Sequence, residues 1–580
     1  MNRNTQDSQM FVKRLLALRV EVSNFGAQIA GQSLRASYST TTKIIRPKYK
    51  HQLSKTVANK PTTTSNVRKT KSSQISKKQS TYGFGEFGGL KSNPNTGRKL
   101  EQSTKLIEKI TSFEHLKLLP EVRDAVGQII VDESAGRIAS RDDVTPSPIQ
   151  TLTIRKLGKS LMDQKLQVHA LAADTGSGKT MAYLAPMMDY LMRQQYENSE
   201  TWETLSRRAC IRAIILVPTH ELVQQVYQTV VQTEALLGFH TFKWDIYTTY
   251  PNLIENIRRR IDILVTTPSK LLTLFNIKQL SRPERILNHV KFLVIDEADT
   301  LMDPSWILET QRVIRHLHEL NHLVFCSATI PNEFNKTLQE FYPSCEAITT
   351  PRLHMLPKKL EFKIIDAALN PFKGSKLKAL AQILYAIRRD STESGYQKRC
   401  IVFVNEKSDV EKLTEKLRSV YGHDVVGLSG DNSVEERLRI VSEFTSPPKR
   451  LTDLGKTQER ETQLNTPLNS NDEQSVRIPW SNIQLETREL GPLTHNGSKS
   501  NKSPLKVLVC TDLLARGLNF QGLRNVILYD VPKTSIDLVH RTGRTGRMRQ
   551  GGRVFVIVDK KTKNRVKAVP QIMKKNMALS

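Results

Sequence analysis

The stretch of this sequence that most limits its possible folds is the glycine-rich run from Ala173 to Thr180 (ADTGSGKT). It follows an apolar run at 168–173 and precedes an amphipathic run at 181–191. This order predicts a strand, a tight loop and a helix, which is the setting of a phosphate-binding loop. Gly176 and Gly178 carry no Cβ, so the backbone there can fold closely around an anion. The run therefore predicts a site for phosphate groups.

The side chains of this loop complete the predicted phosphate site. Backbone amides and the helix N-terminus would point at the phosphates. Lys179 would reach the β- and γ-phosphates, and the hydroxyl of Thr180 would bind Mg²⁺. The alternative is a glycine-rich turn that binds nothing, which the lysine, the threonine and both flanking elements disfavour. The predicted phosphate-binding residues are Ala173, Asp174, Thr175, Gly176, Ser177, Gly178, Lys179 and Thr180.

Short apolar runs alternate with helical stretches on both sides of residue 350. This alternation predicts parallel sheets covered by helices on both faces, so the expected fold is α/β with domains at 106–350 and 361–560. Residues 351–360 (PRLHMLPKKL) are predicted to link the two domains. The expected strands are 213–217, 263–266, 292–296 and 323–327 in the first domain, and 400–404, 425–428, 507–510, 526–529 and 553–558 in the second.

Polar stretches interrupt the second domain and occupy both ends of the chain. Residues 446–504 form a polar insertion whose composition favours disorder. Residues 41–105 are predicted to be a basic, disordered arm, and residues 561–580 a basic tail. Residues 1–40 are poor in acids and contain a basic amphipathic stretch at 11–22, so they resemble a mitochondrial presequence. The alternative for this region is a basic tail that binds RNA.

The net charge indicates the kind of partner, and the cysteine spacing and apolar runs bear on zinc sites, disulfides and membrane spans. The formal net charge of +30 predicts a polyanionic partner, such as nucleic acid or an anionic membrane surface. The five cysteines stand far apart and form no CxxC pair, so neither a zinc site nor a disulfide framework is indicated. No apolar run approaches the roughly 18 residues of a membrane span.

A group of carboxylates follows the expected strand at 292–296. Asp296, Glu297 and Asp299 would emerge at the carboxyl end of that strand, where open parallel sheets bind their ligands. Asp296 would hold Mg²⁺ through water, and Glu297 would orient or deprotonate an attacking water. The alternative is an acidic helix start stabilised by the helix dipole, which a neighbouring phosphate loop makes less favoured.

Arginines at three-residue spacing alternate with glycines between His540 and Arg547 (HRTGRTGR). This spacing is denser and more regular than a solvated surface requires. Planar guanidinium groups suit the charge spread over a transferring phosphoryl group. Arg541 and Arg544 of the second domain would therefore reach phosphates held by the first, and hydrolysis would require the two domains to close.

In their order along residues 110–560, these motifs resemble those of the DEAD-box RNA helicases of superfamily 2. The resemblance implies two tandem RecA-like domains that use ATP and Mg²⁺. It implies catalytic roles for Lys179, Asp296, Glu297, Arg541 and Arg544.

The segment 146–150 (PSPIQ) resembles the Q motif of this family. Gln150 would then bind adenine through paired amide hydrogen bonds. Phe113 would stack on the base, although it lies farther from Gln150 than is usual in the family. An insertion near 131–143 accounts for this distance, and a position of Phe113 in the core is the alternative.

The segments 218–222 (PTHEL) and 267–271 (TPSKL) resemble motifs Ia and Ib, which grip the RNA backbone. Both depart from the family pattern, because His220 replaces an arginine and Ser269-Lys270 replace Gly-Arg. The paired glycine motif between them is not evident, and Val434 replaces a glutamine in the second domain. The RNA-binding residues implied by the resemblance are Pro218, Thr219, Glu221, Thr267, Pro268, Arg437 and Thr511.

Three further segments resemble motifs at the interface of the two domains: 327–329 (SAT), 401–406 (IVFVNE) and 511–519 (TDLLARGLN). Asn519 replaces an aspartate that lies near the ATP in the family, which implies weaker coupling between the domains. The resemblance assigns coupling roles to Asp299, Ser327, Thr329, Arg516 and Gly517.

The leading interpretation is an ATP-dependent RNA helicase, in which ATP joins two weak RNA grips and bends the bound strand so that short duplexes separate. With its presequence-like start, the chain resembles mitochondrial members of the family. This implies the matrix as location, with large-subunit ribosomal RNA and ribosome-assembly intermediates as partners. One alternative is an ATP-gated RNA clamp with little turnover. Another is a DNA helicase, which the Asp-Glu-Ala-Asp sequence together with Gln150 disfavours.

Overall fold

The computed structural model describes residues 104–134, 138–197, 199, 209–278, 280, 282–350, 353–357, 359–393, 395–451, 504–512, 516–546, 551–575 and 579, with the backbone of 475–477 and 484–486. It divides into two units, Met1–Ser76 and Lys77–Ser580, and the described residues all belong to the second. The predicted presequence and nearly all of the predicted arm lie outside the described residues. Within the described part of the chain, every helix is too short or too polar to cross a bilayer.

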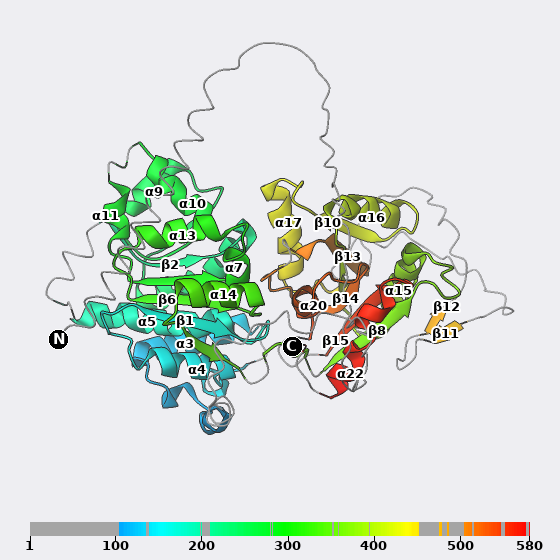
Figure 1. Cartoon of the computed structure of the whole chain (residues 1–580), viewed down its shortest axis with the longest axis horizontal. Coiled ribbons are helices and arrows are strands. Elements are labelled where there is room, and N and C mark those ends of the chain that lie inside the picture. The colour runs from blue at the N-terminus through cyan, green and yellow to red at the C-terminus, as the bar shows by residue number, and fades with distance from the viewer. Residues whose placement is uncertain are drawn as a thin grey trace, which may run out of the picture. The chain divides into compact units, whose positions relative to one another are not determined.

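The first domain is built on a seven-stranded sheet whose neighbouring strands are all parallel, in the order β3-β4-β2-β5-β6-β1-β7 (Figure 1). Because β1 and β5 both pair with β6, the glycine-rich loop after β1 and the carboxylates after β5 lie at one edge. The strands are β1 Gln167–Ala172, β2 Cys210–Leu216, β3 Thr241–Trp244, β4 Arg260–Thr266, β5 Phe292–Asp296, β6 His322–Ser327 and β7 Glu346–Thr349.

Helices cover both faces of this sheet because its strands are apolar on both sides. On β5, Phe292 and Val294 belong to one buried cluster, and Leu293 and Ile295 belong to another. The first cluster includes α3 Pro120–Glu133, α4 Pro148–Leu157, α5 Lys179–Glu197 and α7 His220–Val230. The second includes α9 Tyr250–Ile257, α10 Pro268–Leu272, α11 Pro283–Leu287, α12 Ala298–Leu301, α13 Ile307–His316 and α14 Asn332–Phe341. Shorter elements are η1 Phe113–His115, η2 Arg141–Asp143, α8 Gln232–Leu237 and η3 Thr273–Asn276.

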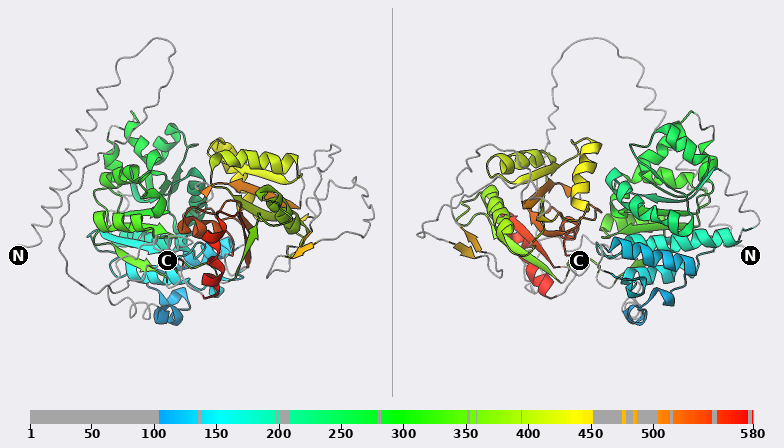
Figure 2. Two further views of the ribbon diagram at one scale, coloured as in Figure 1. Left: turned by 45° about the vertical axis from the view of Figure 1, so that its right-hand side comes forward. Right: turned by 180° about the vertical axis from the view of Figure 1, so that it is seen from behind.

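The second domain repeats this architecture with a six-stranded parallel sheet in the order β10-β13-β9-β14-β15-β8, also covered by helices on both faces (Figure 2). The strands are β8 Leu360–Asp366, β9 Lys398–Phe403, β10 Asp424–Leu428, β13 Leu505–Cys510, β14 Leu523–Leu528 and β15 Gly552–Val558. The helices are α15 Lys376–Arg389, α16 Lys407–Ser419, α17 Val434–Thr445, α20 Ser535–Thr542, α21 Lys563–Val566 and α22 Val569–Lys574. The predicted α/β class with two parallel sheets is confirmed.

Every strand predicted from an apolar run is present, but three strands of the two large sheets, and the short pair β11 and β12 in the insertion, were not predicted. β3 and β7 have four residues each and lie at the two ends of their sheet. β8 (LEFKIID) also lies at a sheet edge, and it includes Leu360, which was assigned to the linker. Edge strands can leave part of their surface in water, so they do not need the continuous apolar run of a central strand.

The first residues of the predicted insertion at 446–504 are bonded to the second domain. The amide of Gln397 donates to the carbonyl of Lys449 at 2.9 Å, and the amide of Leu451 donates to the carbonyl of Gly395 at 2.8 Å. Arg399 strengthens this attachment, because its guanidinium donates to four carbonyls, those of Phe444, Ser446, Pro447 and Gln521.

The insertion returns close to where it leaves. The amide of Lys398 donates to the carbonyl of Pro504 at 2.8 Å, three residues from the bond that holds Leu451. Both ends therefore lie at the amino end of β9, opposite the edge at which parallel sheets bind ligands. Within the insertion, β11 (Ser475–Arg477) and β12 (Gln484–Glu486) pair antiparallel, and residues 452–474, 478–483 and 487–503 lie outside the described part.

Candidate nucleotide and nucleic-acid site

The glycine-rich loop has the predicted geometry, since β1 ends at Ala172 and α5 begins at Lys179. Gly178 has a φ of 86°, and a Cβ there would lie 2.6 Å from Nε2 of Gln150. Glycine is favoured at this position, because the positive φ strains other residues and a Cβ would displace the amide of Gln150. Lys179 Nζ donates to the carbonyls of Ala173 (2.9 Å) and Asp174 (3.1 Å), so it already lies over the loop.

Gln150 connects α4 to this loop. Ser147 caps α4, and the Oε1 of Gln150 accepts from the amide of Ser147 at 2.8 Å, which completes a capping box. Nε2 of Gln150 donates to the carbonyl of Gly178 at 3.3 Å. The amide predicted to bind adenine thus lies directly against the loop. Phe113, predicted to stack on the base, is 5% exposed and belongs to the core cluster, which is the alternative that the sequence left open.

Asp296 and Glu297 stand at the end of β5 in an unusual backbone conformation. Glu297 has a φ of 49°, in the left-handed region that costs a side chain with a Cβ some strain. Asp296 Oδ1 accepts from the amide of Glu297 at 2.9 Å, and its Oδ2 accepts from the hydroxyl of Tyr183 at 3.0 Å. Glu297 Oε2 is buried and has no hydrogen-bond partner among the described residues. A donor supplied by a ligand or water would satisfy it.

Burial controls the electrostatics of this carboxylate pair. Burial, and then the charge of Glu297, raise the pKa of Asp296 to about 6, although Lys179 opposes the shift. Burial also raises the pKa of Tyr183 well above its ordinary value, so its hydroxyl stays protonated and donates to Asp296. The sequence analysis did not find Tyr183. Its position four residues after Lys179 on α5 was the available signal, since such residues share one helix face.

His540 of α20 joins the carboxylates of the first domain. Its Nε2 lies 3.0 Å from Asp299 Oδ2 and 3.2 Å from the hydroxyl of Thr329, which itself donates to Asp299 at 2.8 Å. Burial alone would raise the pKa of Asp299, but the hydrogen bond and charge of His540, with Arg516, outweigh it and hold that pKa well below its usual range. Ser327 Oγ accepts from the amide of Thr329 at 3.1 Å. The sequence analysis assigned His540 no role.

The two predicted arginines have different surroundings. Arg541 donates to both carboxylate oxygens of Asp512 (2.6 and 2.7 Å), to Asn405 Oδ1 (2.7 Å) and to the carbonyl of Asp530 (3.0 Å). All these partners belong to the second domain, so Arg541 makes no bond to the loop of the first.

Arg544 lies closer to the carboxylates. It donates to the carbonyls of His540 (2.9 Å) and Leu518 (3.0 Å), while its Nη2 has no partner among the described residues. Burial lowers the pKa of Arg544 to about 10, against the favourable charge of Glu297. Next to it, the carbonyl of Gly543 accepts from the hydroxyl of Thr175 at 3.0 Å, so the arginine-rich turn contacts the glycine-rich loop.

The segment 516–519 makes further contacts with the first domain. Arg516 donates to the hydroxyl of Thr300 (3.0 Å) and to Asp537 (3.0 Å). Gln225 of α7 donates to the carbonyl of Gly517 (3.3 Å) and accepts from the amide of Asn519. Asn519, predicted near the ATP, is thus bonded to α7. The sequence analysis did not identify Gln225, because its partners, the backbone groups of Gly517 and Asn519, lie far away in the sequence.

Gly517 lies at a close contact between the two domains. Its φ is 68°, and a Cβ there would lie 2.8 Å from Cδ2 of Leu222 and 3.0 Å from Oε1 of Glu297. The absence of a side chain at this position therefore allows the second domain to approach the carboxylate edge of the first.

The predicted RNA-binding residues come from both domains: Pro218, Thr219, Glu221, Thr267 and Pro268 follow β2 and β4 of the first, and Arg437 and Thr511 belong to the second. Thr219 caps α7 and Thr267 caps α10, each hydroxyl accepting from an amide of the first turn. Pro218 and Pro268 are buried, and Thr511 is half-buried. Glu221 is buried and forms an ion pair at 2.9 Å with Arg437 of α17, so its carboxylate binds a cation of the second domain.

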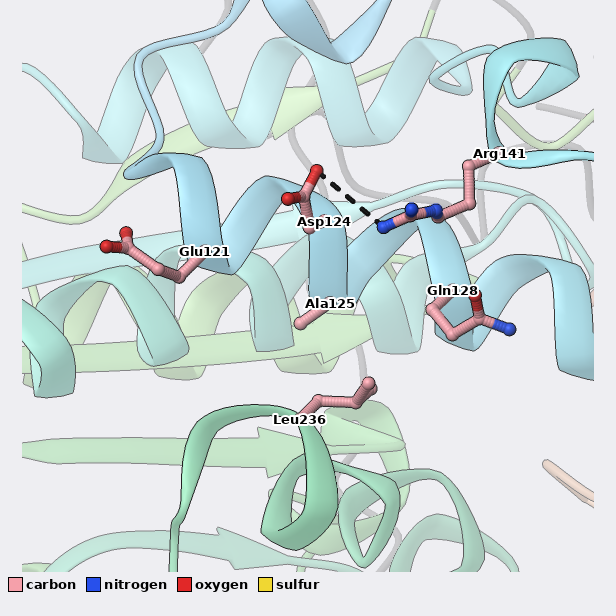
Figure 3. A pocket seen from close by; sticks show the side chains of 6 residues that line it. All are labelled: Glu121, Asp124, Ala125, Gln128, Arg141 and Leu236. Carbon is pink, nitrogen blue, oxygen red and sulfur yellow. Dashed lines mark ion pairs between the residues drawn. The ribbon is translucent and has the colours of Figure 1, made fainter.

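A surface hollow of about 370 Å³ lies elsewhere in the first domain, between α3, η2 and α8 (Figure 3). Glu121, Asp124 and Gln128 line it from α3, and Leu236 faces them. Arg141 enters from η2 and lies 3.9 Å from Asp124. The hollow contains no residue of the predicted site. All five cysteines are free thiols, of which four are buried and Cys345 is half-buried.

Two known domain families match the chain. The DEAD/DEAH box helicase family matches residues 147–337, which span the Q-motif-like segment, the glycine-rich loop and the carboxylates. The helicase conserved C-terminal domain matches residues 494–549, which include the arginine-rich turn.

Curated relatives match over most of the chain. A Vanderwaltozyma polyspora protein called "ATP-dependent RNA helicase MRH4, mitochondrial" is 54% identical over 500 residues, which cover 86% of this chain and 90% of the relative. The Saccharomyces cerevisiae protein of the same name is 52% identical over 544 residues, covering 92% and 95%.

Solved structures share the fold. S. cerevisiae Dbp5 bound to RNA and ADP BeF3 aligns with a TM-score of 0.54 and 22% identity, covering 81% of this chain and 94% of that one. Mss116p bound to ssRNA and AMP-PNP aligns with the same TM-score and 19% identity, covering 80% and 76%. At these identities the likeness concerns the fold alone.

Proposed function

Because the chain belongs to the DEAD-box family of ATP-dependent RNA helicases, we propose that it uses ATP to clamp and locally unwind structured RNA in mitochondria. We propose mitochondrial large-subunit ribosomal RNA, bound during ribosome assembly, as its target. The mitochondrial names of relatives more than 50% identical support the location. The net charge of +30 supports a large polyanionic partner.

The observation that carries the clamp is the hydrogen-bonded network of Asp299, Thr329 and His540. It joins the carboxylate edge of the first domain to the arginine-rich turn of the second. A nucleotide in the glycine-rich loop would lie beside this network, since Thr175 of the loop already bonds Gly543. ATP would therefore add contacts to both domains at once and stabilise their closed arrangement.

Hydrolysis would depend on groups that already face one another. Glu297 would orient or deprotonate the attacking water through Oε2, its unpartnered oxygen among the described residues. Lys179 would transfer its hydrogen bonds from the loop carbonyls to the β- and γ-phosphates. Arg544 would stabilise the charge that develops on the transferred phosphoryl group, and Arg541 would first have to release Asp512.

The residues present fit the Mg²⁺ that such ATP sites use. Asp296 and Glu297 are adjacent carboxylates in a buried setting that raises the pKa of Asp296, so a cation would relieve their repulsion. The hydroxyl of Thr180 and, through water, Asp296 would hold the ion. When bound, Mg²⁺ would offset the negative charge of the phosphates.

RNA would bind along the edge formed by the starts of α7 and α10, where Thr219 and Thr267 are the caps. Backbone amides at these helix starts favour phosphate oxygens. Burial lowers the pKa of His220, which keeps this side chain neutral and limits it to a weak phosphate contact. The closure of the second domain would then bend the bound strand.

Steady-state ATP hydrolysis by the full chain, with and without structured RNA, tests the activity. Stimulation by RNA that fades between low and high salt supports an RNA-coupled helicase. ATP-dependent RNA binding without turnover would instead indicate the clamp with little hydrolysis.

The RNA target is tested by ultraviolet cross-linking of the Glu297→Gln variant in mitochondria and sequencing of the bound RNA. Enrichment of messenger RNA over large-subunit ribosomal RNA would refute the proposed target.

A further inference from the structure

A short loop of the first domain exposes several large apolar side chains. It connects β3 to α9 and spans 245–249. Ile246 is 49% exposed, Tyr247 is 43% exposed, and Tyr250, the first residue of α9, is 47% exposed. Single exposed apolar residues are ordinary, but two tyrosines and an isoleucine within five residues form a patch that the fold does not need.

The loop is held in a defined shape. Asp245 Oδ1 accepts from the amides of Tyr247 (3.0 Å) and Thr248 (3.1 Å), and its other oxygen forms an ion pair with Lys243 at 3.1 Å. Thr249 caps α9 by accepting from the amide of Asn252. Both tyrosines are therefore presented from a backbone fixed by hydrogen bonds, so binding a ligand would cost little ordering of the loop.

Strand order places this loop at the edge proposed to bind RNA. β3 pairs with β4, and β4 pairs with β2, all parallel. The loop after β3 therefore lies next to Thr267, which follows β4, and then Thr219, which follows β2. The tyrosines extend this edge outward by one strand. They occupy the part of the sequence where the paired glycine motif of the family is not evident.

The charges around the two tyrosines differ: Lys270 lies beside Tyr250, whereas Tyr247 is near the acids Glu435, Asp245 and Glu221 as well as near Arg437. Lys270 Nζ lies 5.8 Å from the ring centroid of Tyr250 and 5.7 Å from that of Trp244. Two neighbouring acids are already paired: Asp245 with Lys243, and Glu221 with Arg437. An aromatic surface beside a lysine is the combination that binds single-stranded nucleic acid through base faces and phosphates together.

We propose that Tyr247 and Tyr250 form a stacking platform for unpaired bases of single-stranded RNA, with Lys270 binding the adjacent phosphate. This rests on the proposed RNA-binding function and specifies how that edge grips the strand. Stacking is tolerant of sequence because every base has an aromatic face. The platform would hold a strand after separation and slow its return to the duplex.

The test is the affinity of the full-length protein, with AMP-PNP, for a fluorescent single-stranded RNA and for an abasic strand of equal length. Tyr247→Ala with Tyr250→Ala should weaken binding of the normal RNA about tenfold. The same double variant should bind the abasic strand as the wild type does. Phe at both positions should restore binding, because stacking needs the ring and not the hydroxyl.

Two controls separate stacking from other effects. Tyr196→Ala removes a tyrosine of similar exposure on α5, away from this edge, and should leave both affinities unchanged. Lys270→Ala should reduce the salt dependence of binding, whereas the tyrosine variants should not. Unchanged binding of normal RNA by the double alanine variant would overturn the platform and leave the patch as a surface for a protein partner. Wild-type protein that binds no RNA would instead refute the proposed function.

Discussion

The carboxylate half and the arginine half of the site differ in how completely their charges are paired. In the first domain, Glu297 has a left-handed backbone and a buried oxygen without a partner among the described residues. Its neighbour Asp296 has a raised pKa because it is buried. In the second domain, Arg541 donates to Asp512, Asn405 and a backbone carbonyl. The carboxylate of Glu297 is thus incompletely paired, whereas the guanidinium of Arg541 is fully paired within its own domain.

This difference teaches which half must change during the reaction. In the proposed mechanism, the first domain would exchange only the bonds of Lys179 to the loop carbonyls, since the carboxylates and the glycine-rich loop already lie at the same edge. In the proposed mechanism, the second domain would exchange the existing bonds of Arg541 for new ones to the phosphates. Substitution of Glu297 should therefore alter the chemistry, whereas substitution of the partners of Arg541 should alter the stability.

The largest expected effect comes from Glu297→Gln. Loss of the group that orients or deprotonates water should lower ATP hydrolysis by about 100-fold or more, while ATP and RNA binding persist. Turnover under saturating RNA, together with nucleotide affinity, measures this. Glu333→Gln on the exposed start of α14 is the matched control and should hydrolyse ATP normally. Persistent turnover in the Glu297 variant would remove this residue from the mechanism.

Asp512→Ala should act on the fold. It leaves the charge of Arg541, a side chain that is only 1% exposed, without its main partner. Such a loss should lower the free energy of unfolding by about 3 kcal/mol. Chemical denaturation of the second domain measures it. Asp431→Ala breaks an exposed ion pair with Lys407 and should cost less than about 1 kcal/mol. Equal effects from the two variants would contradict the contrast drawn here.

The pH dependence of the free energy of unfolding should reveal the cost of ionising the buried carboxyl group of Asp296. Its pKa is about 6 in the folded state, against about 3.9 when unfolded. Between these values the folded state keeps a proton that the unfolded state releases, so stability falls as the pH rises through this window.

Asp296→Asn removes this titration. The stability of the variant relative to the wild type should therefore rise by about 2 kcal/mol between about pH 4 and about pH 7. Denaturant unfolding at the two pH values measures the change. Asp299, whose pKa is lowered, should contribute in the opposite sense, losing stability only as the pH falls below about 4. A pH-independent difference for the Asn variant would show that ionising Asp296 carries no such cost.

The smallest effect should come from replacing residues 452–503 with a short Gly-Ser linker. Both ends of this segment are fixed at the amino end of β9, since Leu451 bonds Gly395 and Pro504 bonds Lys398. The midpoint of thermal unfolding should change by about 2 °C or less, and ATP hydrolysis should remain. Arg399→Met is the comparison, because it removes the bonds that fix the root and should destabilise more. Loss of cooperative unfolding in the linker variant would show that the insertion belongs to the core.

The central strands and the glycine-rich loop could be predicted from the sequence, because both depend on residues that are adjacent in the chain. Buried central strands need continuous apolar runs, and each such run forms a strand. The loop at Ala173–Thr180 could also be predicted, because glycine positions and flanking elements determine its shape. β3, β7 and β8 were missed because edge strands tolerate mixed composition, as in the sequence TFKW of β3.

Contacts between distant residues could not be predicted in the same way. His540, Tyr183 and Gln225 gain their importance only from partners brought near by the fold. Phe113 was expected at the adenine, and the structure buries it in the core, because an aromatic ring satisfies either environment. The family resemblance identified Glu221 and Arg541 as site residues. Their bonding partners became evident only from the three-dimensional structure.

The contact at Gly517 sets a limit on how this protein can vary. A methyl group at residue 517 would lie between the two domains and would contact the side chains of Leu222 and Glu297. Every catalytic group would remain, and each domain would still fold and bind its own ligands. The ends of the Leu222 and Glu297 side chains would have to shift, and the positive φ would strain any residue other than glycine, so this position ties the approach of the second domain to the placement of Glu297.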